Sequence, residues 1–158
     1  MSDRGIKLIA SNRKARHDYH ILETVEAGLV LTGTEVKSLR AGRASIKEAY
    51  ARVAEGEIHL VGAHIPEYSH GNRTNHEPTR ARKLLLHRRE IDRLQGRVLE
   101  KGCTLVPLRL YWRAGRAKVE IALVRGKREH DRREDVAKRE AQREMDRAVS
   151  RRIKGQDE

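Results

Sequence analysis

Apolar side chains alternate with polar ones over several stretches of the chain, and a period of two residues is typical of β-strands. The clearest stretch is residues 103–124, where every second position from Val106 to Trp112 is apolar. Ala114-Gly115 then supplies a tight turn, and a second alternating run follows it. This stretch predicts a long antiparallel hairpin.

Two further stretches have a similar pattern. Residues 49–65 contain Glu55-Gly56, a two-residue turn of the kind that joins antiparallel strands. Residues 19–31 also alternate, and Gly28, which tolerates a positive φ, favours a turn at residues 26–28. We therefore expect two more hairpins.

Periods of three and four residues predict helices elsewhere. In residues 32–45, Thr32 or Thr34 can cap a short helix that ends at Gly42. In residues 87–102, apolar residues recur at helical spacing until a glycine ends the pattern.

The remaining segments show neither period. Residues 1–11 are expected to form a flexible arm, and Asn12 can cap a short helical turn that extends to Arg16. Residues 66–82 are polar, contain Gly and Pro and are expected to form an exposed loop.

About six short antiparallel strands with two or three helices are typical of a small Greek-key barrel. We predict a mainly β, OB-like antiparallel barrel with short flanking helices, which is the commonest nucleic-acid scaffold of this type. The predicted organisation is an arm at 1–11, a barrel at 12–124 and a basic C-terminal tail at 125–158.

The tail is dense in charge of both signs, with 12 Lys and Arg against 9 Asp and Glu in residues 125–158. Its apolar residues recur every four positions, but the stripe is narrow and begins with Ala137 and Ala141. An isolated helix of this length is marginal in water without a packed face. We expect a segment that is disordered when free and helical when bound; a merely solubilising tail is the alternative.

The whole chain has 35 Lys and Arg against 23 Asp and Glu, a net charge of +12 and a pI near 10.3. Such a charge favours a polyanionic partner, with nucleic acid first and an anionic membrane surface as the rival. However, no apolar run approaches the roughly 20 residues of a membrane-spanning helix. The first residues also lack a sustained apolar stretch of signal-peptide type, so we expect a cytoplasmic protein without membrane contact.

No catalytic, metal or cofactor site is expected. His17 and His20 are three residues apart but fall across a helix–strand boundary, and no third metal ligand is evident. Cys103 has no obvious base beside it, and His130-Asp131 has no supporting cluster. The chain also contains no Phe and one Trp, Trp112, which its pattern places in the core. Recognition of RNA is therefore expected to rest on shape and phosphates more than on stacked bases.

Three long motifs and one shorter one resemble a known family. They are GTEVKSLRAGRASI at 33–46, PTRARKLLLHRREI at 78–91, RGKREHDRRED at 125–135, and Asn12 to Tyr19. Together they are similar to the SsrA-binding protein family, also called small protein B, and the similarity extends from about residue 6 to about residue 153.

The resemblance implies an RNA-binding protein of ribosome rescue, or trans-translation. The barrel would bind the tRNA-like domain of transfer-messenger RNA (tmRNA) as a monomer. With elongation factor Tu and GTP, the complex would enter the A site of a stalled ribosome. The tail would fold as a helix in the empty mRNA channel. The alternative is a structural ribosome-associated protein that binds rRNA permanently.

The resemblance also implies site residues. The family positions that bind the tRNA-like domain are matched here by Asn12, Tyr19, Glu26 and Leu85. Leu85 could instead act by supporting the fold. Glu26 could accept a hydrogen bond from a base edge or fix a neighbouring Arg. The basic residues that complete the expected RNA-binding set, together with one glycine, are Arg13, Lys14, Arg16, Arg125, Gly126, Lys127 and Arg128. The expected contacts with the ribosome and its decoding centre are His130, Arg132, Arg133, Lys138 and Arg139.

One departure concerns the tail. Members of the family often carry an aromatic residue where this chain has Ala141, so a stacking contact is not expected at this position. Residues 66–82 receive no functional role.

Overall fold

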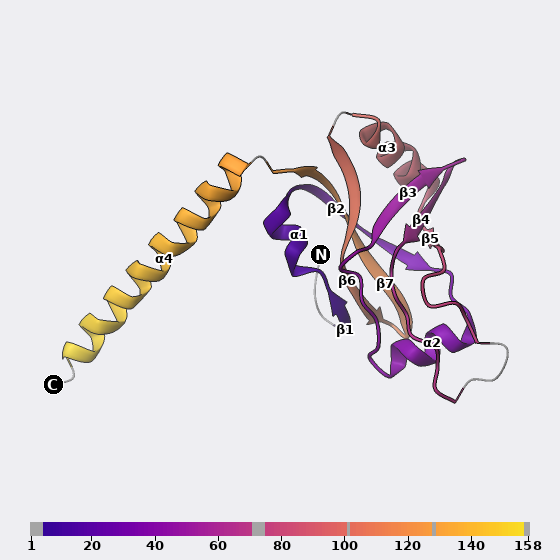
Figure 1. The fold of residues 1–158 in the computed structure, drawn as a ribbon, viewed down its shortest axis with the longest axis horizontal. Helices are drawn as coiled ribbons and strands as arrows, with labels where there is room; N and C mark the ends of the chain where they lie inside the picture. The colour runs from indigo at the N-terminus through magenta and orange to yellow at the C-terminus, as the bar shows by residue number, and fades with distance from the viewer. Residues whose placement is uncertain (1–4, 71–74, 101, 128, 157–158) are drawn as a thin grey trace. The chain divides into compact units, whose positions relative to one another are not determined.

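The structure is a computed structural model that describes residues 5–70, 75–100, 102–127 and 129–156; the side chains of 129–132 and 156 are not described. The chain divides into two compact units, Met1–Gly126 and Lys127–Glu158. Figure 1 shows the elements, which in chain order are β1 (Ile6–Ser11), α1 (Arg13–Asp18), β2 (Tyr19–Leu29), α2 (Gly33–Arg40), β3 (Tyr50–Ala54), β4 (Glu57–Val61), β5 (Arg82–Leu85), α3 (Arg88–Val98), β6 (Cys103–Arg113), β7 (Arg116–Gly126) and α4 (Glu129–Gln156).

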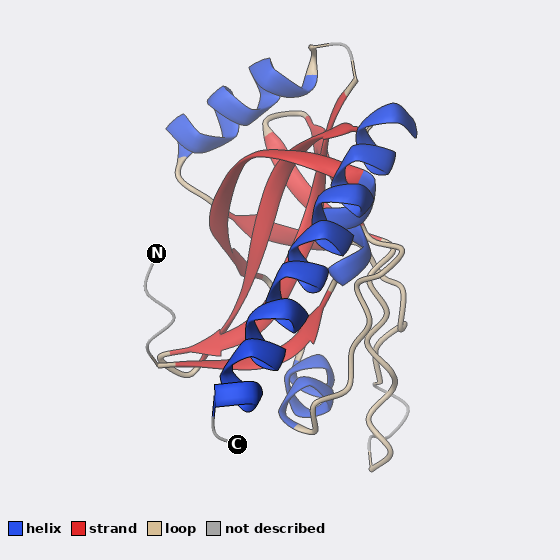
Figure 2. Cartoon of the chain, turned by 90° about the vertical axis from the view of Figure 1, so that its left-hand side faces the viewer, coloured by secondary structure: helices blue, strands red, loops and turns tan. Residues whose placement is uncertain are grey.

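The first unit is a closed antiparallel barrel. In the part of the chain that the structure describes, seven strands pair in the order β1-β6-β3-β4-β5-β2-β7, and β6 also pairs with β7. This last pairing closes a ring of strands, as Figure 2 shows, with β1 added along the free part of β6. The prediction of a mainly β, OB-like barrel with short helices is confirmed.

The two hairpins with clear turn chemistry are confirmed. In the β3–β4 turn, Glu55 and Gly56 have φ values of 52° and 76°, and in the β6–β7 turn, Ala114 and Gly115 have values of 50° and 74°. Two consecutive positive φ angles give the turn whose twist matches a two-stranded antiparallel ribbon. Local sequence was therefore sufficient to place both hairpins.

The predicted hairpin at 19–31 is wrong. Residues 19–29 form one long strand, β2, which pairs with β7 from Tyr19 to Gly28. Gly28 is needed for close packing and not for a turn, because a Cβ atom at this position would lie 3.3 Å from Cβ of Leu85 on β5. The glycine allows β5 to approach β2.

The expected arm at 1–11 is also corrected. Residues 1–4 lie outside the described residues, but Ile6–Ser11 forms β1, which pairs antiparallel with β6. The free edge of β6 provides backbone partners that the sequence pattern of this short segment did not indicate. The barrel body therefore begins before Asn12.

The core has two parts. The barrel interior is filled by buried apolar residues of the strands and of α2 and α3, including Leu39, Leu94 and Ile121. A smaller cluster lies on the outer face of β6 and β7, where Ala15 of α1 covers Leu108 and Val124. Helix α1 therefore covers part of the outer face of the barrel.

The helices α2 and α3 confirm the predicted ones. Thr32 precedes α2 and forms a capping box with Glu35, while α3 ends at Val98, four residues before the expected stop at Gly102. The loop expected at 66–82 is only partly exposed, because His76 is buried and its Nε2 atom lies 2.8 Å from the Ile65 carbonyl oxygen.

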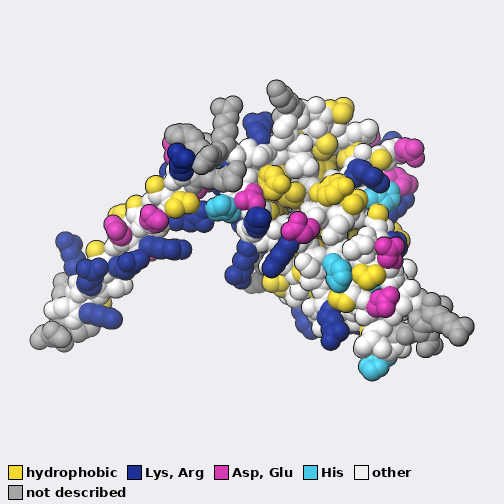
Figure 3. Space-filling model, in the orientation of Figure 1, with side chains coloured by type: hydrophobic (Ala, Val, Ile, Leu, Met, Phe, Trp, Pro, Cys, Tyr) yellow, Lys and Arg dark blue, Asp and Glu magenta, His cyan; other side chains and the backbone are white. Residues whose placement is uncertain are grey.

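The second unit consists of the long helix α4, Glu129–Gln156. Its described apolar side chains are exposed, and Met145, Val149 and Ile153 are each more than half exposed. Figure 3 shows hydrophobic side chains gathered along one edge of this helix. The apolar stripe therefore has no packing partner in the described residues of its own unit, and the expectation of disorder in the free state stays a prediction.

No helix in the described residues is long and apolar enough to cross a membrane.

Candidate nucleic-acid interface

Helix α1 presents three of the expected RNA-binding cations. Arg13, Lys14 and Arg16 are exposed, while Ala15 is buried against β6 and β7. This pattern follows from the shortness of the six-residue helix, in which one apolar residue faces the barrel and its neighbours face solvent. The result is a compact basic surface.

Asn12 lies beneath this surface. It is buried, its backbone N–H donates to the Leu108 carbonyl at 2.8 Å, and its Nδ2 donates to the Pro107 carbonyl at 3.2 Å. Its side chain makes no cap hydrogen bond to α1, which corrects the predicted cap. Asn12 therefore anchors the start of α1 to β6, and this geometry supports an indirect effect on RNA through the position of α1.

The start of β2 brings further expected residues to α1. Tyr19 pairs with Gly126 and His20 pairs with Arg125, so the ends of β2 and β7 lie side by side immediately after the helix. Arg125 and Gly126 are exposed, and Tyr19 is half-buried against the outer apolar cluster. A hollow of about 150 Å³ beside Tyr19 is also lined by Lys14 and Lys47, and the sequence analysis did not select Lys47.

Glu26 and Leu85 form a second group farther along β2. Both line a hollow of about 610 Å³ together with Arg93 and Lys118. Leu85 is 53% exposed, so it is a surface residue and does not act by filling the core. Tyr19 and Glu26 are seven residues apart on β2, which corresponds to roughly 20 Å at the rise of a strand. The expected RNA-binding residues of the barrel therefore fall into two groups, one beside Tyr19 at the start of β2 and one beside Glu26 farther along it.

Glu26 makes specific contacts with β6. Its Oε2 atom accepts from Tyr111 Oη at 2.5 Å and from Arg113 Nη1 at 2.7 Å. Burial raises the pKa of Tyr111 above its ordinary value, and the hydrogen bond to Glu26 raises it further, so the phenol remains a donor. Sequence reasoning missed both partners, since Tyr111 and Arg113 are 85 and 87 residues away from Glu26.

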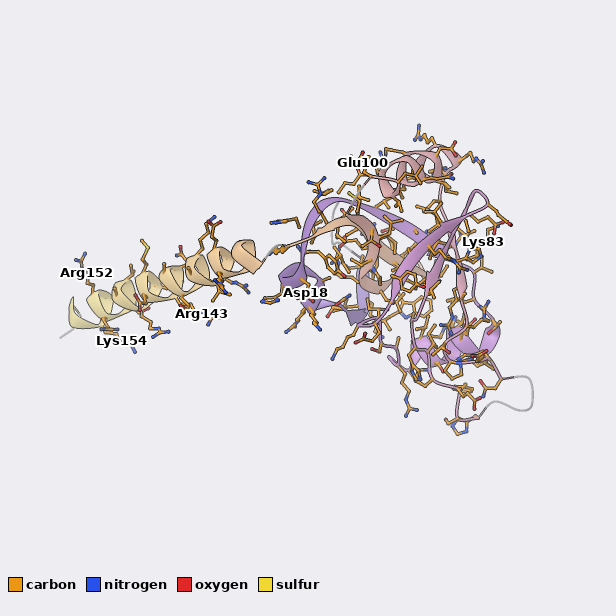
Figure 4. The ribbon with its side chains drawn as sticks, turned by 45° about the horizontal axis from the view of Figure 1, so that its top comes forward. Asp18, Lys83, Glu100, Arg143, Arg152 and Lys154 are labelled. Carbon is orange, nitrogen blue, oxygen red and sulfur yellow. The ribbon has the colours of Figure 1, made fainter. Side chains whose placement is uncertain are left out.

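The remaining expected residues belong to the second unit. Lys127 forms an ion pair with Asp135, and Arg133, Lys138 and Arg139 are exposed on α4. Arg128 lies outside the described residues, as do the side chains of His130 and Arg132. Figure 4 shows Arg143, Arg152 and Lys154 projecting from the same helix. Helix α4 thus carries cations along most of its length, beyond those that the family motif indicated.

The surroundings of the two histidines near α1 consist of one acidic neighbour and exposed cations. His17 Nδ1 lies 3.0 Å from Asp18 Oδ1, and the described residues contain no group of three His, Cys, Asp or Glu side chains placed to hold a metal ion. The arrangement is suited to binding anions: exposed cations on α1 and at the ends of β2 and β7, and more cations around the hollow at Glu26.

Comparison with known proteins gives consistent matches. A family model described as SmpB protein matches residues 9–151. The SsrA-binding protein of Acidothermus cellulolyticus is 65% identical over 151 residues, which cover 96% of this chain and 95% of that protein. The SsrA-binding protein of Thermobifida fusca is 66% identical over 148 residues, which cover 94% of this chain and 92% of that protein.

A solved structure described as "tmRNA-SmpB: a journey to the center of the bacterial ribosome" is also similar. It has 48% sequence identity and a TM-score of 0.65, and the match covers 84% of this chain and 94% of that chain. The resemblance that the sequence motifs indicated is confirmed over nearly the whole length. The chain belongs to the SmpB protein family.

Proposed function

We propose that this protein binds tmRNA and acts with it in the rescue of stalled ribosomes by trans-translation. The observation that carries this proposal is the match of the family model to residues 9–151. The similar solved structure, whose description names tmRNA, SmpB and the bacterial ribosome, supports the same partners for this chain.

The barrel would bind the tRNA-like domain of tmRNA. The first 124 residues carry a net charge of +9, and α1 exposes Arg13, Lys14 and Arg16. Lys and Arg at such a surface neutralise phosphates and release counterions. The few aromatic residues, 3% of the chain, favour recognition of RNA shape over stacking on unpaired bases.

The tail would occupy the mRNA channel of the ribosome as a helix. Helix α4 has exposed apolar residues, and its exposed Lys138 and Arg139 are suited to contacts with rRNA phosphate. The expected contacts with the decoding centre at His130, Arg132 and Arg133 belong to this proposal. The folded helix would gain from the ribosome the packing partner that it lacks on its own.

Three further parts of the proposal concern the setting of this function. The protein would act as a monomer, enter the A site with elongation factor Tu and GTP, and reside in the cytoplasm. It would have no catalytic activity and no cofactor. The family membership supports the lack of a catalytic activity, because a protein that positions an RNA on the ribosome requires binding surfaces and no reaction of its own.

Identification of the bound RNA tests the proposal. The tagged full-length protein would be purified from a bacterial host at low salt, and its RNA sequenced. Strong enrichment of tmRNA over all other RNA is expected. Recovery of rRNA alone would instead support a structural ribosome-associated protein and contradict the rescue function. A reconstituted translation assay, which measures addition of the tmRNA-encoded peptide to a stalled chain, tests the rescue step itself.

A further inference from the structure

The outer face of β6 carries a row of three side chains, Arg109, Tyr111 and Arg113, at alternate positions of the strand. The guanidinium carbons of Arg109 and Arg113 lie 5.3 Å and 5.5 Å from the centre of the Tyr111 ring. Both distances are within the range of cation–π contacts. One buried ring thus supports two arginines, one on each side along the strand.

Each arginine is also held by a carboxylate of another strand, Arg109 by the adjacent β7 and Arg113 by β2, which lies beyond β7. Glu26 on β2 accepts from Arg113 at 2.7 Å, and Glu120 on β7 accepts from Arg109 at 3.0 Å. Glu26 and Glu120 are opposite each other in the β2–β7 register. Since Tyr111 also donates to Glu26, residues of β2 and β6 together fix the orientation of the Arg113 side chain.

The row is bordered by more positive charge. Lys118 is opposite Tyr111, and the exposed Arg116 is opposite Arg113, in the β6–β7 register. Lys118 also lines the hollow that contains Glu26 and Leu85. The cations of this surface therefore outnumber its two carboxylates, and the surface favours an anionic ligand.

We propose that this part of the barrel is a binding site for an RNA phosphate, in which Arg113 contacts the phosphate and Glu26 is a positioning residue that acts through Arg113. The inference rests on the proposed function, because the phosphate would belong to the bound tmRNA. It extends that function to Arg113, which the family motifs did not indicate.

The chemistry of arginine favours this assignment. A planar guanidinium matches two oxygens of a phosphate, and holding it in place before binding reduces the loss of side-chain freedom. The Arg113 side chain is 26% exposed, so a phosphate can reach it, whereas its support, Tyr111, is fully buried. The Tyr111 ring and the Glu26 carboxylate thus hold one accessible cation, the Arg113 guanidinium, in a fixed position.

This geometry explains why an acidic residue can promote RNA binding. A carboxylate close to a polyanion repels it, so Glu26→Gln should tighten binding if charge alone mattered. If Glu26 positions Arg113, the same substitution should weaken binding. The sign of the change in affinity therefore separates these two roles.

A double-mutant cycle tests the inference. Affinity of the full-length protein for a transcribed tRNA-like domain of bacterial tmRNA would be measured for the wild type, Glu26→Gln, Arg113→Gln and the double variant. Each single variant is expected to weaken binding by about tenfold. The double variant is expected to be no weaker than Arg113→Gln, because Glu26 then has no arginine to position.

Salt dependence separates this role from a general loss of folding. Arg113→Gln should lower the slope of log affinity against log salt by about one, the loss of a single phosphate contact. Arg40→Gln, at an exposed position on α2, is the matched control and should leave affinity unchanged. Tyr111→Phe keeps the buried ring but removes the hydrogen bond to Glu26, and it should weaken binding less than Arg113→Gln.

Three results would overturn the inference. Wild-type affinity and slope in Arg113→Gln would show that Arg113 makes no contact with the phosphate. An equal loss from Glu26→Gln in both backgrounds would show that Glu26 contacts the RNA directly. A loss of affinity that merely follows a lowered melting temperature would assign the row to folding. Failure of the wild type itself to bind would instead refute the proposed function.

Discussion

Glu35 on α2 and Arg82 on β5 form an ion pair in which both side chains are completely buried, with Arg82 Nε donating to Glu35 Oε2 at 2.5 Å. The other carboxylate oxygen accepts from Arg80 at 2.5 Å and from the Thr32 backbone N–H at 2.8 Å. Arg82 also donates to the Ala63 carbonyl at 2.8 Å. Glu35, Arg80 and Arg82 lie within the motifs at 33–46 and 78–91. These motif residues therefore maintain the fold.

Glu35→Gln should destabilise the barrel strongly. The substitution leaves the Arg82 guanidinium buried without its counter-charge, and breaking a buried ion pair from one side costs about 3–5 kcal/mol. Urea unfolding at pH 7 measures this loss of free energy.

The exposed pair Arg88–Asp92 on α3 provides a matched control. Its N–O distance is 3.4 Å and the Asp92 side chain is 57% exposed. Asp92→Asn should therefore change the free energy of unfolding by less than about 1 kcal/mol. A comparably small effect of Glu35→Gln would contradict the role assigned to the buried pair.

The same carboxyl group should make stability depend on pH. Burial by itself raises the pKa of Glu35, but hydrogen bonds from Arg80, Thr32 and Arg82 outweigh it and lower the pKa from 4.5 to about 2. A carboxyl group with a lowered folded-state pKa stabilises the protein above its unfolded-state pKa, and this contribution is lost as pH falls towards the folded-state value.

The contribution of Glu35 should therefore be complete above about pH 5 and decline between about pH 4.5 and pH 2. Its size is on the order of 3 kcal/mol, from the difference between the two pKa values. Urea unfolding from pH 7 to pH 2 would measure it, and Glu35→Gln should reduce the slope of stability against pH. An unchanged slope in Glu35→Gln would mean that other carboxyl groups cause the acid sensitivity.

Binding of the barrel to a tRNA-like RNA should weaken steeply with salt. The net charge of +9 on residues 1–124 and the few aromatic side chains favour contacts to phosphates. Affinity measured between about 50 and 200 mM salt should fall by at least a hundredfold if several phosphates are neutralised. A flat response would indicate that hydrogen bonds to bases or apolar contacts dominate.

The tail should be separable from RNA binding. Ala141→Pro removes a backbone donor in the middle of α4 and costs about 3 kcal/mol in a helix interior. We expect unchanged affinity for the tRNA-like RNA and loss of peptide tagging on stalled ribosomes. Ala141→Ser keeps the backbone N–H and should retain tagging.

A shortened chain extends this test. A protein that ends at Glu129 keeps every element of the first unit and should bind RNA nearly as well as the full chain, but it should not support tagging. Normal tagging by the Ala141→Pro variant would show that the tail does not act as a helix.

Local sequence determined the elements whose signals are contained in a few residues. Glu55-Gly56 and Ala114-Gly115 adopt paired positive φ angles because of their own turn chemistry, so the two hairpins were predictable. Capping residues and apolar spacing are also local signals, so α2 and α3 were predictable as well. The family motif at 12–19 likewise indicated the cations of α1 as RNA-binding residues, and these cations are exposed.

Tertiary structure decided the features that depend on closure of the barrel. Glycine is typical of turns, but Gly28 lies within β2. There it leaves room for the side chain of Leu85, its partner on β5, which is 57 positions later in the chain. The segment Ile6–Ser11 becomes a strand only because β6 offers it a free edge. Backbone pairing between distant segments overrides weak local preference in both cases.

The candidate site shows the same division. The family resemblance implied Glu26 as a site residue, but its partners Tyr111 and Arg113 come from β6, 85 and 87 residues later. No local spacing reports such a contact, because the side chains meet only when β2, β7 and β6 lie in register on one face of the closed sheet. The sequence therefore determined which kinds of residue were present for binding RNA, while the closed barrel decided which of them work together.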